Sequence, residues 1–287
     1  MVFQNRKSKN TGGSCGPELW EIFRPVVLFV LLYLVIQYGC LLEIRHLRAS
    51  GPGPVKEFIR ARPGLCLAVM MVVPTASALS FVYREGKRRL SAFRKVRGED
   101  GRKEKGKKAA IRASLAAAAC ALCVFFNAQI QVLGLESDSV YAMQPLYREF
   151  PFFFVLLLTA VFTPFAEEFV FRGILYTGLR CRLAVLPSVL ISAALFGLYH
   201  GELLQGTYAF LMGLFFALSM ELTGELRMPW ILHGISNGLP LCLSCFGVWE
   251  GFLMPERRIT ALLLALVSLG LTAALGFWEK KAGDHAA

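Results

Sequence analysis

Two adjacent acids followed by an arginine are the first residues of this sequence that could do chemistry. Glu167 and Glu168 follow the apolar run 152–162, and Arg172 comes four residues after Glu168. An ionisable side chain in hydrocarbon costs at least ~2.5 kcal/mol on insertion scales, so such a residue is a functional candidate. Residues four apart share a helix face, so Arg172 can neutralise Glu168. Glu167 lies about 100° further round the helix and remains available as a base.

Two histidines in later apolar runs extend this set of polar residues. His200 ends the stretch that begins at Phe196, and His233 is followed four residues later by Asn237. On a helix His233 and Asn237 project from one face, and the small Gly234 between them allows a close neighbouring helix. Each group alone is typical of an ordinary interfacial or buried polar contact. Together with the two acids they predict proton-transfer or metal chemistry inside a membrane.

The composition indicates that membrane-spanning helices position these residues. The 287 residues are 55% hydrophobic and 18% charged, whereas soluble domains carry about 25% charged residues. Apolar runs of roughly 17 to 25 residues are long enough to span a membrane as helices. We therefore predict an all-α, polytopic integral membrane protein with about eight transmembrane helices, at 25–42, 64–83, 113–134, 151–170, 183–199, 203–222, 229–248 and 259–278.

The distribution of charge divides the chain and predicts its orientation. Residues 84–108 hold 12 Lys and Arg against 4 Asp and Glu, a net charge of +8. We interpret this segment as a cytoplasmic loop that obeys the positive-inside rule and contacts anionic lipid, and we expect no nucleic-acid partner. Both termini are then cytoplasmic. The predicted parts are a disordered N-terminus at 1–20, three helices with the basic loop at 21–134, a core at 150–245, and a last helix with a cytoplasmic tail at 246–287.

The eight cysteines do not predict a disulfide framework, because most lie in apolar runs. Cys120 and Cys123, and likewise Cys242 and Cys245, have C-x-x-C spacing, but neither pair has flanking turn residues or a second ligand pair nearby. We interpret them as small apolar helix residues.

The ordered motifs resemble one family. Glu-Glu-x-x-x-Arg at 167–172, Phe-x-x-x-His at 196–200 and His-x-x-x-Asn at 233–237 are similar to those of the CPBP intramembrane proteases. That family includes the type 2 CAAX prenyl endopeptidases and bacterial bacteriocin-processing or self-immunity proteins. The resemblance covers about residues 150–245, and the first three predicted helices carry none of it.

The resemblance implies a role for each motif residue. Glu167 would be the general base that, with His200, activates a water to attack a peptide carbonyl, and His233 and Asn237 would stabilise the oxyanion. Glu168, Arg172 and Phe196 would support these four. Members have been described both as metalloproteases and as metal-independent glutamate proteases, and Glu167, His200 and His233 are residue types that could hold Zn²⁺.

The resemblance also implies a substrate and a location. The substrate would be a membrane-embedded or lipidated peptide, including a prenylated one, and the protein would lie among the lipids of a bacterial plasma membrane. Two other functions fit the same residues: a catalytically idle immunity or partner-binding protein, and a proton-coupled transporter that relays through Glu167 and His233.

One geometric requirement follows from the predicted boundaries. If the helices ran simply over 151–170 and 183–199, Glu167 and His200 would lie near opposite membrane faces, ~25 Å apart at 1.5 Å per residue. Shared chemistry therefore requires the helix that carries Glu167 to continue through Gly173 to Leu179.

Overall fold

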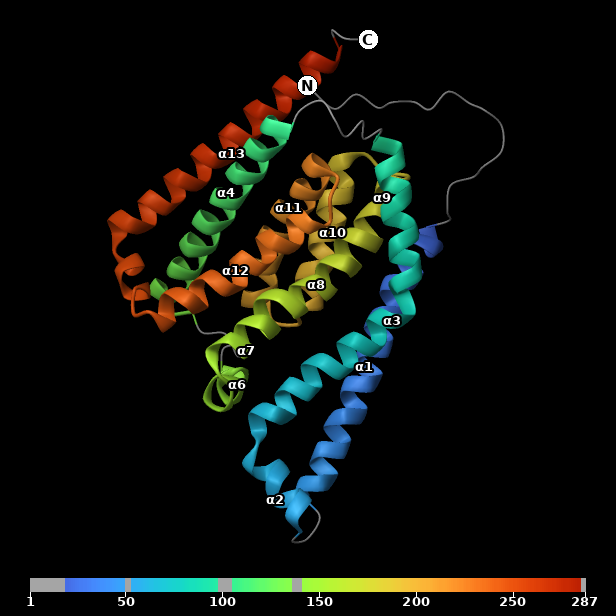
Figure 1. The fold of residues 1–287 in the computed structure, drawn as a ribbon, viewed down its shortest axis with the longest axis vertical. Coiled ribbons are helices and arrows are strands. Elements are labelled where there is room, and N and C mark those ends of the chain that lie inside the picture. The colour runs from blue at the N-terminus through green and yellow to red at the C-terminus, as the bar shows by residue number, and fades with distance from the viewer. Residues whose placement is uncertain (1–18, 50–52, 98–104, 136–140, 285–287) are drawn as a thin grey trace.

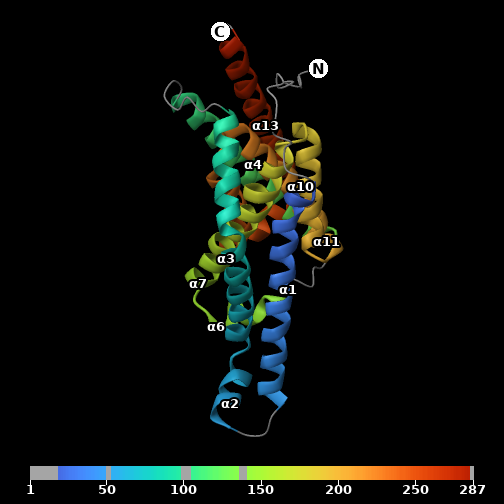
Figure 2. The same cartoon turned by 90° about the vertical axis from the view of Figure 1, so that its right-hand side faces the viewer.

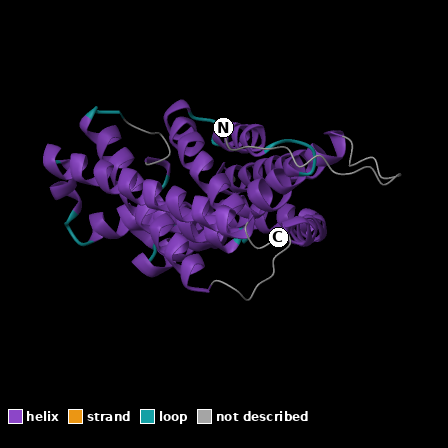
Figure 3. Cartoon of the chain, turned by 90° about the horizontal axis from the view of Figure 1, so that it is seen from above, coloured by secondary structure: helices purple, strands orange, loops and turns teal. Residues whose placement is uncertain are grey.

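Every regular element of the described chain is a helix. The computed structural model describes residues 19–49, 53–97, 105–135 and 141–284, and Figure 3 shows helices joined by short loops throughout these ranges. The predicted all-α class is confirmed. The predicted disorder at 1–20 falls almost entirely on residues outside the described ranges, and the first helix begins at Leu19. The helices of the first half are α1 (Leu19–Ala49), α2 (Pro54–Ala61), α3 (Pro63–Arg97), α4 (Lys105–Val132) and α6 (Gln144–Glu149).

Six helices in the described ranges are long and apolar enough to cross a membrane, so the chain is an integral membrane protein. These six segments are Trp20–His46, Pro63–Lys95, Ala109–Val132, Phe152–Arg180, Leu203–Thr223 and Pro255–Leu275. The other two predicted spans are also helical, as α10 (Val185–Tyr199) and α12 (Arg227–Cys245). They fall outside the six because α10 has only 15 residues and α12 is interrupted by polar residues such as His233 and Asn237.

The helix that carries the two acids is longer than the apolar run predicted. Helical structure is continuous from Phe152 to Arg180, so the acids lie near its middle and the predicted end at residue 170 is wrong. The segment is divided into α7 (Phe152–Leu156), η1 (Leu157–Phe162), α8 (Thr163–Glu168), η2 (Phe169–Tyr176) and α9 (Thr177–Arg180). Both η1 and η2 are π-helical. The apolar run by which the helix was predicted ends at the charged residues. The helix itself continues past them because all eight η2 residues are buried against other parts of the protein.

The π-helical turns receive hydrogen bonds from side chains of other helices. In η1, the Trp230 indole donates to the Val161 carbonyl at 3.0 Å. In η2, the Ser192 hydroxyl donates to the carbonyl of Phe171 at 3.1 Å. Arg89 donates to the carbonyl of Ile174, also at 3.1 Å. These donors come from α12, α10 and α3, so the irregular helix is fixed from three sides.

The remaining helices surround this central segment. In Figure 1 the α7–α9 segment crosses the middle of the molecule, with α10, α11 (Leu203–Thr223) and α12 packed around it. On one side α4 pairs with α13 (Pro255–Asp284), which follows the short η3 (Trp249–Leu253). On the other side α1 and α3 form a hairpin whose α2 end projects well beyond the other helices (Figures 1 and 2).

The predicted basic loop at 84–108 is mostly helical, which corrects its boundaries. Helix α3 continues to Arg97 and α4 begins at Lys105, so only residues 98–104 lie outside the described chain. Its charges form ion pairs along α3: Arg88 and Arg89 both bind Glu85, at 2.8 and 2.6 Å. The basic segment therefore forms the helical end of α3 and the helical start of α4, on either side of residues 98–104.

Candidate functional site

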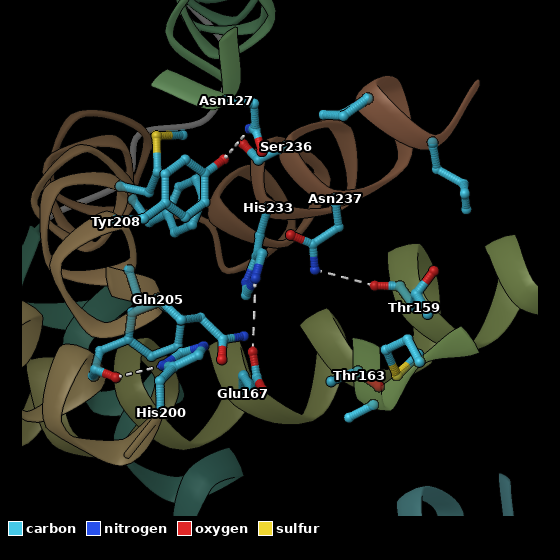
Figure 4. Close-up of a pocket in the computed structure, with 18 of the residues that line it drawn as sticks. Asn127, Thr159, Thr163, Glu167, His200, Gln205, Tyr208, His233, Ser236 and Asn237 are labelled. Carbon is cyan, nitrogen blue, oxygen red and sulfur yellow. Dashed lines mark hydrogen bonds and ion pairs between the residues drawn. The ribbon is translucent and has the colours of Figure 1, made fainter. Parts of the chain in front are cut away.

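The four predicted catalytic residues line one cavity. Its volume is about 600 Å³, and Glu167, His200, His233 and Asn237 all contribute to its wall. Figure 4 shows Glu167 rising from the central helix between His200 on one side and His233 and Asn237 on the other. The structure thus brings together residues from α8, the end of α10 and α12.

The second acid, Glu168, points away from the cavity into a closed polar contact. Its Oε1 accepts a hydrogen bond from Arg172 at 2.8 Å, and both side chains are fully buried. The predicted pairing of Glu168 with Arg172 is confirmed. Arg172 also donates to the Gly213 carbonyl at 3.0 Å, and its guanidinium carbon lies 4.4 Å from the centre of the Phe196 ring. The guanidinium carbon also lies 5.4 Å from the centre of the Phe216 ring, so the charge of Arg172 is balanced by one carboxylate and two aromatic faces.

His233 connects the two acids. Its Nδ1 lies 2.9 Å from Glu168 Oε1, and its Nε2 lies 3.6 Å from Glu167 Oε2. Because an ionised carboxylate only accepts hydrogen bonds, Nδ1 carries the proton and Nε2 faces Glu167. The ring is sandwiched by aromatic neighbours, stacked on Phe216 at 4.9 Å and in edge contact with Phe196 at 5.6 Å between centres. Glu168 therefore orients His233, a contact that the sequence did not predict.

His200 presents a basic nitrogen to the cavity. Its Nδ1 lies 2.8 Å from the Phe196 carbonyl oxygen, which can only accept, so Nδ1 is the protonated nitrogen. In the neutral ring the lone pair is then on Nε2. The Phe196 ring packs edge-on against His200 at 4.8 Å, so the Phe-x-x-x-His motif supplies both a hydrogen bond and a steric support. A carboxylate and a basic imidazole nitrogen facing one cavity can together orient and deprotonate a water.

Asn237 is tied to the irregular turn η1. Its Nδ2 donates to the Thr159 carbonyl at 3.1 Å, which leaves the second N–H of the amide for the cavity. A hypothetical Cβ on Gly234 would lie 2.5 Å from the Ala160 carbonyl oxygen, so only glycine lets α12 approach η1 this closely. This contact brings both motif residues of α12 to the central helix.

A second glycine contact brings His200 into position. A Cβ on Gly197 would lie 2.7 Å from the Gly206 carbonyl oxygen, and one on Gly206 would lie 2.8 Å from that of Gly197. The backbones of α10 and α11 therefore touch where α10 ends and α11 begins. The short connection that follows His200 is held against the cavity by this crossing.

Several cavity residues were missed by sequence reasoning. The neutral polar residues of the wall that belong to none of the three motifs are Tyr33, Gln37, Asn127, Tyr147, Thr159, Thr163, Gln205 and Tyr208. Three of them come from α1 and α4, although the first helices show no motif. Burial raises the pKa of Tyr147 in α6, which keeps its hydroxyl neutral. Single neutral residues in apolar runs give no spacing signal, and only an excess of Asn and Gln in these runs could have indicated them.

Glu167, His200 and His233 are residue types that could hold Zn²⁺, but they do not form a three-ligand group in the described structure. Among the described residues no three His, Cys, Asp or Glu side chains lie close enough to bind one metal ion. Glu167 and His233 approach each other within 3.6 Å, but they are only two ligands. The described cysteines are free thiols, and Cys123 lies buried with its sulfur against the Cys120 carbonyl at 3.2 Å. Cys120 and Cys123 thus pack as helix residues.

Comparison with known proteins identifies this core. No curated protein and no solved structure gives a significant match to the chain. A family model does match, over residues 149–239, which include all three motifs and the helices α7 to α12 that bring them together. This membrane core is therefore similar to the type II CAAX prenyl endopeptidase Rce1-like family.

Proposed function

We propose that this protein is an intramembrane endopeptidase that hydrolyses a peptide bond of a membrane-associated peptide, with prenylated C-terminal peptides as its first candidate substrates. The observation that carries the proposal is the convergence of Glu167, His200 and His233 on one cavity between membrane helices. Similarity to the Rce1-like family supports the same reaction class.

In the proposed mechanism Glu167 is the general base. A water held between its carboxylate and His200 Nε2 loses a proton to Glu167 as its oxygen attacks the peptide carbonyl. The carbonyl oxygen becomes an oxyanion, which accepts hydrogen bonds from the free N–H of Asn237 and from His233, whose Nε2 also carries a proton in the doubly protonated ring. The C–N bond then breaks, and Glu167 returns the proton to the leaving amine. Glu168 acts through His233, because its bond to Nδ1 fixes the ring that faces the reaction.

We derive this mechanism without a metal because the described side chains present no three-ligand site. A chelator tests that choice. Purified protein should retain its activity after dialysis against 1,10-phenanthroline, since water activation needs only the side chains. Loss of activity that returns with added Zn²⁺ would instead assign Glu167 and His233 to a metal centre.

Orientation in the membrane is part of the proposal. Helix α1 begins, and α3 and α13 end, in the upper part of Figure 1, so the basic ends of α3 and α4 share one side with the start of α1 and the end of α13. The positive-inside rule assigns that side to the cytoplasm.

Activity is tested with reconstituted protein. An internally quenched farnesylated peptide ending in Cys-aliphatic-aliphatic-Met should be cleaved by wild-type protein and not by Glu167→Gln. Glu250→Gln is the matched control, because Glu250 is exposed in η3 and lies outside the cavity. Comparative proteomics of membranes containing wild-type or Glu167→Gln protein should show an accumulating precursor. Cleavage by Glu167→Gln at the wild-type rate would refute the role of Glu167. Absence of both cleavage by wild type and an accumulating precursor would favour the idle-binder or transporter function.

A further inference from the structure

Most polar side chains of the cavity are already used by the protein itself. Each of the following donates to a backbone carbonyl oxygen of its own or a neighbouring helix, at 2.8 to 3.1 Å: Asn127, Thr159, Ser236 and Asn237. Tyr208 lies 3.4 Å from Asn127 Nδ2. These groups shape the wall, and their strongest hydrogen bonds are not available to a substrate.

Gln205 differs from these groups. It lies in the first turn of α11 and lines the cavity, and its carboxamide makes no hydrogen bond to any other described residue. Figure 4 shows it on the same side of Glu167 as His200, next to the reacting groups. A carboxamide provides two N–H donors and a carbonyl acceptor. Gln205 therefore brings a complete, unused hydrogen-bonding group to the catalytic residues.

The fold holds Gln205 in this place. Gly206, the next residue, touches the backbone of Gly197 so closely that a Cβ on either would clash with the other's carbonyl oxygen. The same crossing positions His200, three residues after Gly197. Because one backbone contact fixes both residues, the distance of Gln205 from the catalytic imidazole is set by the scaffold and not by a mobile loop.

The chemistry of a carboxamide indicates what it binds. In an extended peptide the N–H and C=O of one residue point to the same side, as in the hydrogen-bonded pairs of an antiparallel sheet. A carboxamide presents an acceptor and a donor side by side, so it can bind both groups of one residue at once. Being neutral, it does this without changing the charge around Glu167.

We propose that Gln205 binds the main chain of a substrate residue flanking the cleaved bond and so sets the register of the peptide. This proposal rests on the proposed endopeptidase function. It makes Gln205 a specificity-determining residue that recognises an extended backbone and not a particular side chain.

An ester scan tests the proposal. In a series of the internally quenched farnesylated peptides, each peptide bond flanking the cleaved one is replaced in turn by an ester, which removes one N–H. Wild-type kcat/KM should fall about tenfold at one position, because a buried acceptor loses its donor. Gln205→Leu should have a lower kcat/KM than wild type on the parent peptide. Its kcat/KM should nevertheless fall less than twofold when the ester replaces the peptide bond at that same position. Product masses show that the cleaved bond is unchanged.

Two further variants keep the test decisive. Thr207→Val, at an exposed position of the same helix, should retain the wild-type ester profile. If Gln205→Leu fails to fold, Gln205→Asn replaces it in the test. Its carboxamide is one methylene shorter, so its kcat/KM should show only part of the wild-type sensitivity to the ester. If wild type cleaves the parent peptide and Gln205→Leu shows the same ester profile as wild type, Gln205 has no role in main-chain binding. If wild type cleaves no peptide of the series, the proposed cleavage of prenylated peptides is refuted, and with it the role of Gln205 in binding them.

Discussion

Replacing Glu168 by glutamine should destabilise the protein far more than the same change at Glu167. Glu168 Oε1 accepts two hydrogen bonds, from Arg172 at 2.8 Å and from His233 at 2.9 Å, and it is fully buried. Glutamine preserves the shape and both bonds but removes the charge. Its NH₂ group would take the place of Oε2, which has no partner among the described residues.

The size of the effect follows from these contacts. Hydrogen bonds to charged groups contribute about 1.5–3 kcal/mol and neutral ones about 0.5–1.5 kcal/mol, so two bonds weakened together cost about 2–3 kcal/mol. Breaking a buried ion pair by removing one partner costs about 3–5 kcal/mol. Because glutamine keeps the geometry, we expect about 3 kcal/mol, which is roughly a 150-fold change in the unfolding equilibrium. Glu167 is partly exposed and makes no ion pair with an arginine of the described chain, so Glu167→Gln should change the free energy of unfolding by less than about 1 kcal/mol.

The assay is equilibrium unfolding of purified protein in bicelles, followed by tryptophan fluorescence, with wild type and both variants at equal concentration. The unfolding midpoint of Glu167→Gln should lie close to that of wild type. The midpoint of Glu168→Gln should lie well below both. Equal midpoints for the two variants would show that the buried Glu168–Arg172–His233 contact does not stabilise the fold as its geometry indicates.

Three other predictions follow from the same geometry. Glu167→Gln should lower kcat by about 10² to 10⁴, the usual contribution of a general base. Single-turnover kinetics measures this effect, and a smaller decrease would contradict the role of Glu167 as the base. Gly206→Ala should destabilise the protein by about 1–3 kcal/mol, because its Cβ would meet the Gly197 carbonyl oxygen at 2.8 Å; an unchanged thermal midpoint would contradict this. A cysteine engineered at Gly101, which lies outside the described residues, should react with membrane-impermeant maleimide only after cells are opened, and labelling of intact cells would reverse the orientation.

The sequence alone predicted the helical class, the pairing of Glu168 with Arg172 and the similarity of the membrane core to one family. These features rest on local spacing and composition, which a sequence displays directly. The contact between His233 and Glu168 joins residues 65 apart and depends on how α12 packs against the central helix. No local pattern encodes it, and the resemblance assigned Glu168 only a supporting role.

The depth of Glu167 and His200 shows why the helix boundaries mattered. The turn at 181–184 joins the central helix to α10, so both residues are reached from the same membrane face. Thirteen residues separate Glu167 from Arg180 and fifteen separate His200 from Val185, distances of about 20 and 22 Å at 1.5 Å per residue. Both are less than the ~30 Å hydrocarbon core, so both residues lie at similar depth within it. Hydropathy ended the helix at residue 170 because buried Arg172 looks like a boundary until its partners are known.

The π-helical turns η1 and η2 affect how this protein can change length during evolution. Each turn contains backbone groups that are bonded from outside, by Asn237 and Trp230 in η1 and by Arg89 and Ser192 in η2. A π-helical turn holds one residue more than an α-helical turn, so deleting one residue there would restore an ordinary turn and leave the helix beyond it facing the same way. A deletion between 157 and 162 would thus keep both acids directed as they are and remove only the widened turn. The same deletion in α8, which has no extra residue to lose, would rotate the helix beyond it by about 100° and turn Arg172 away from Gly213.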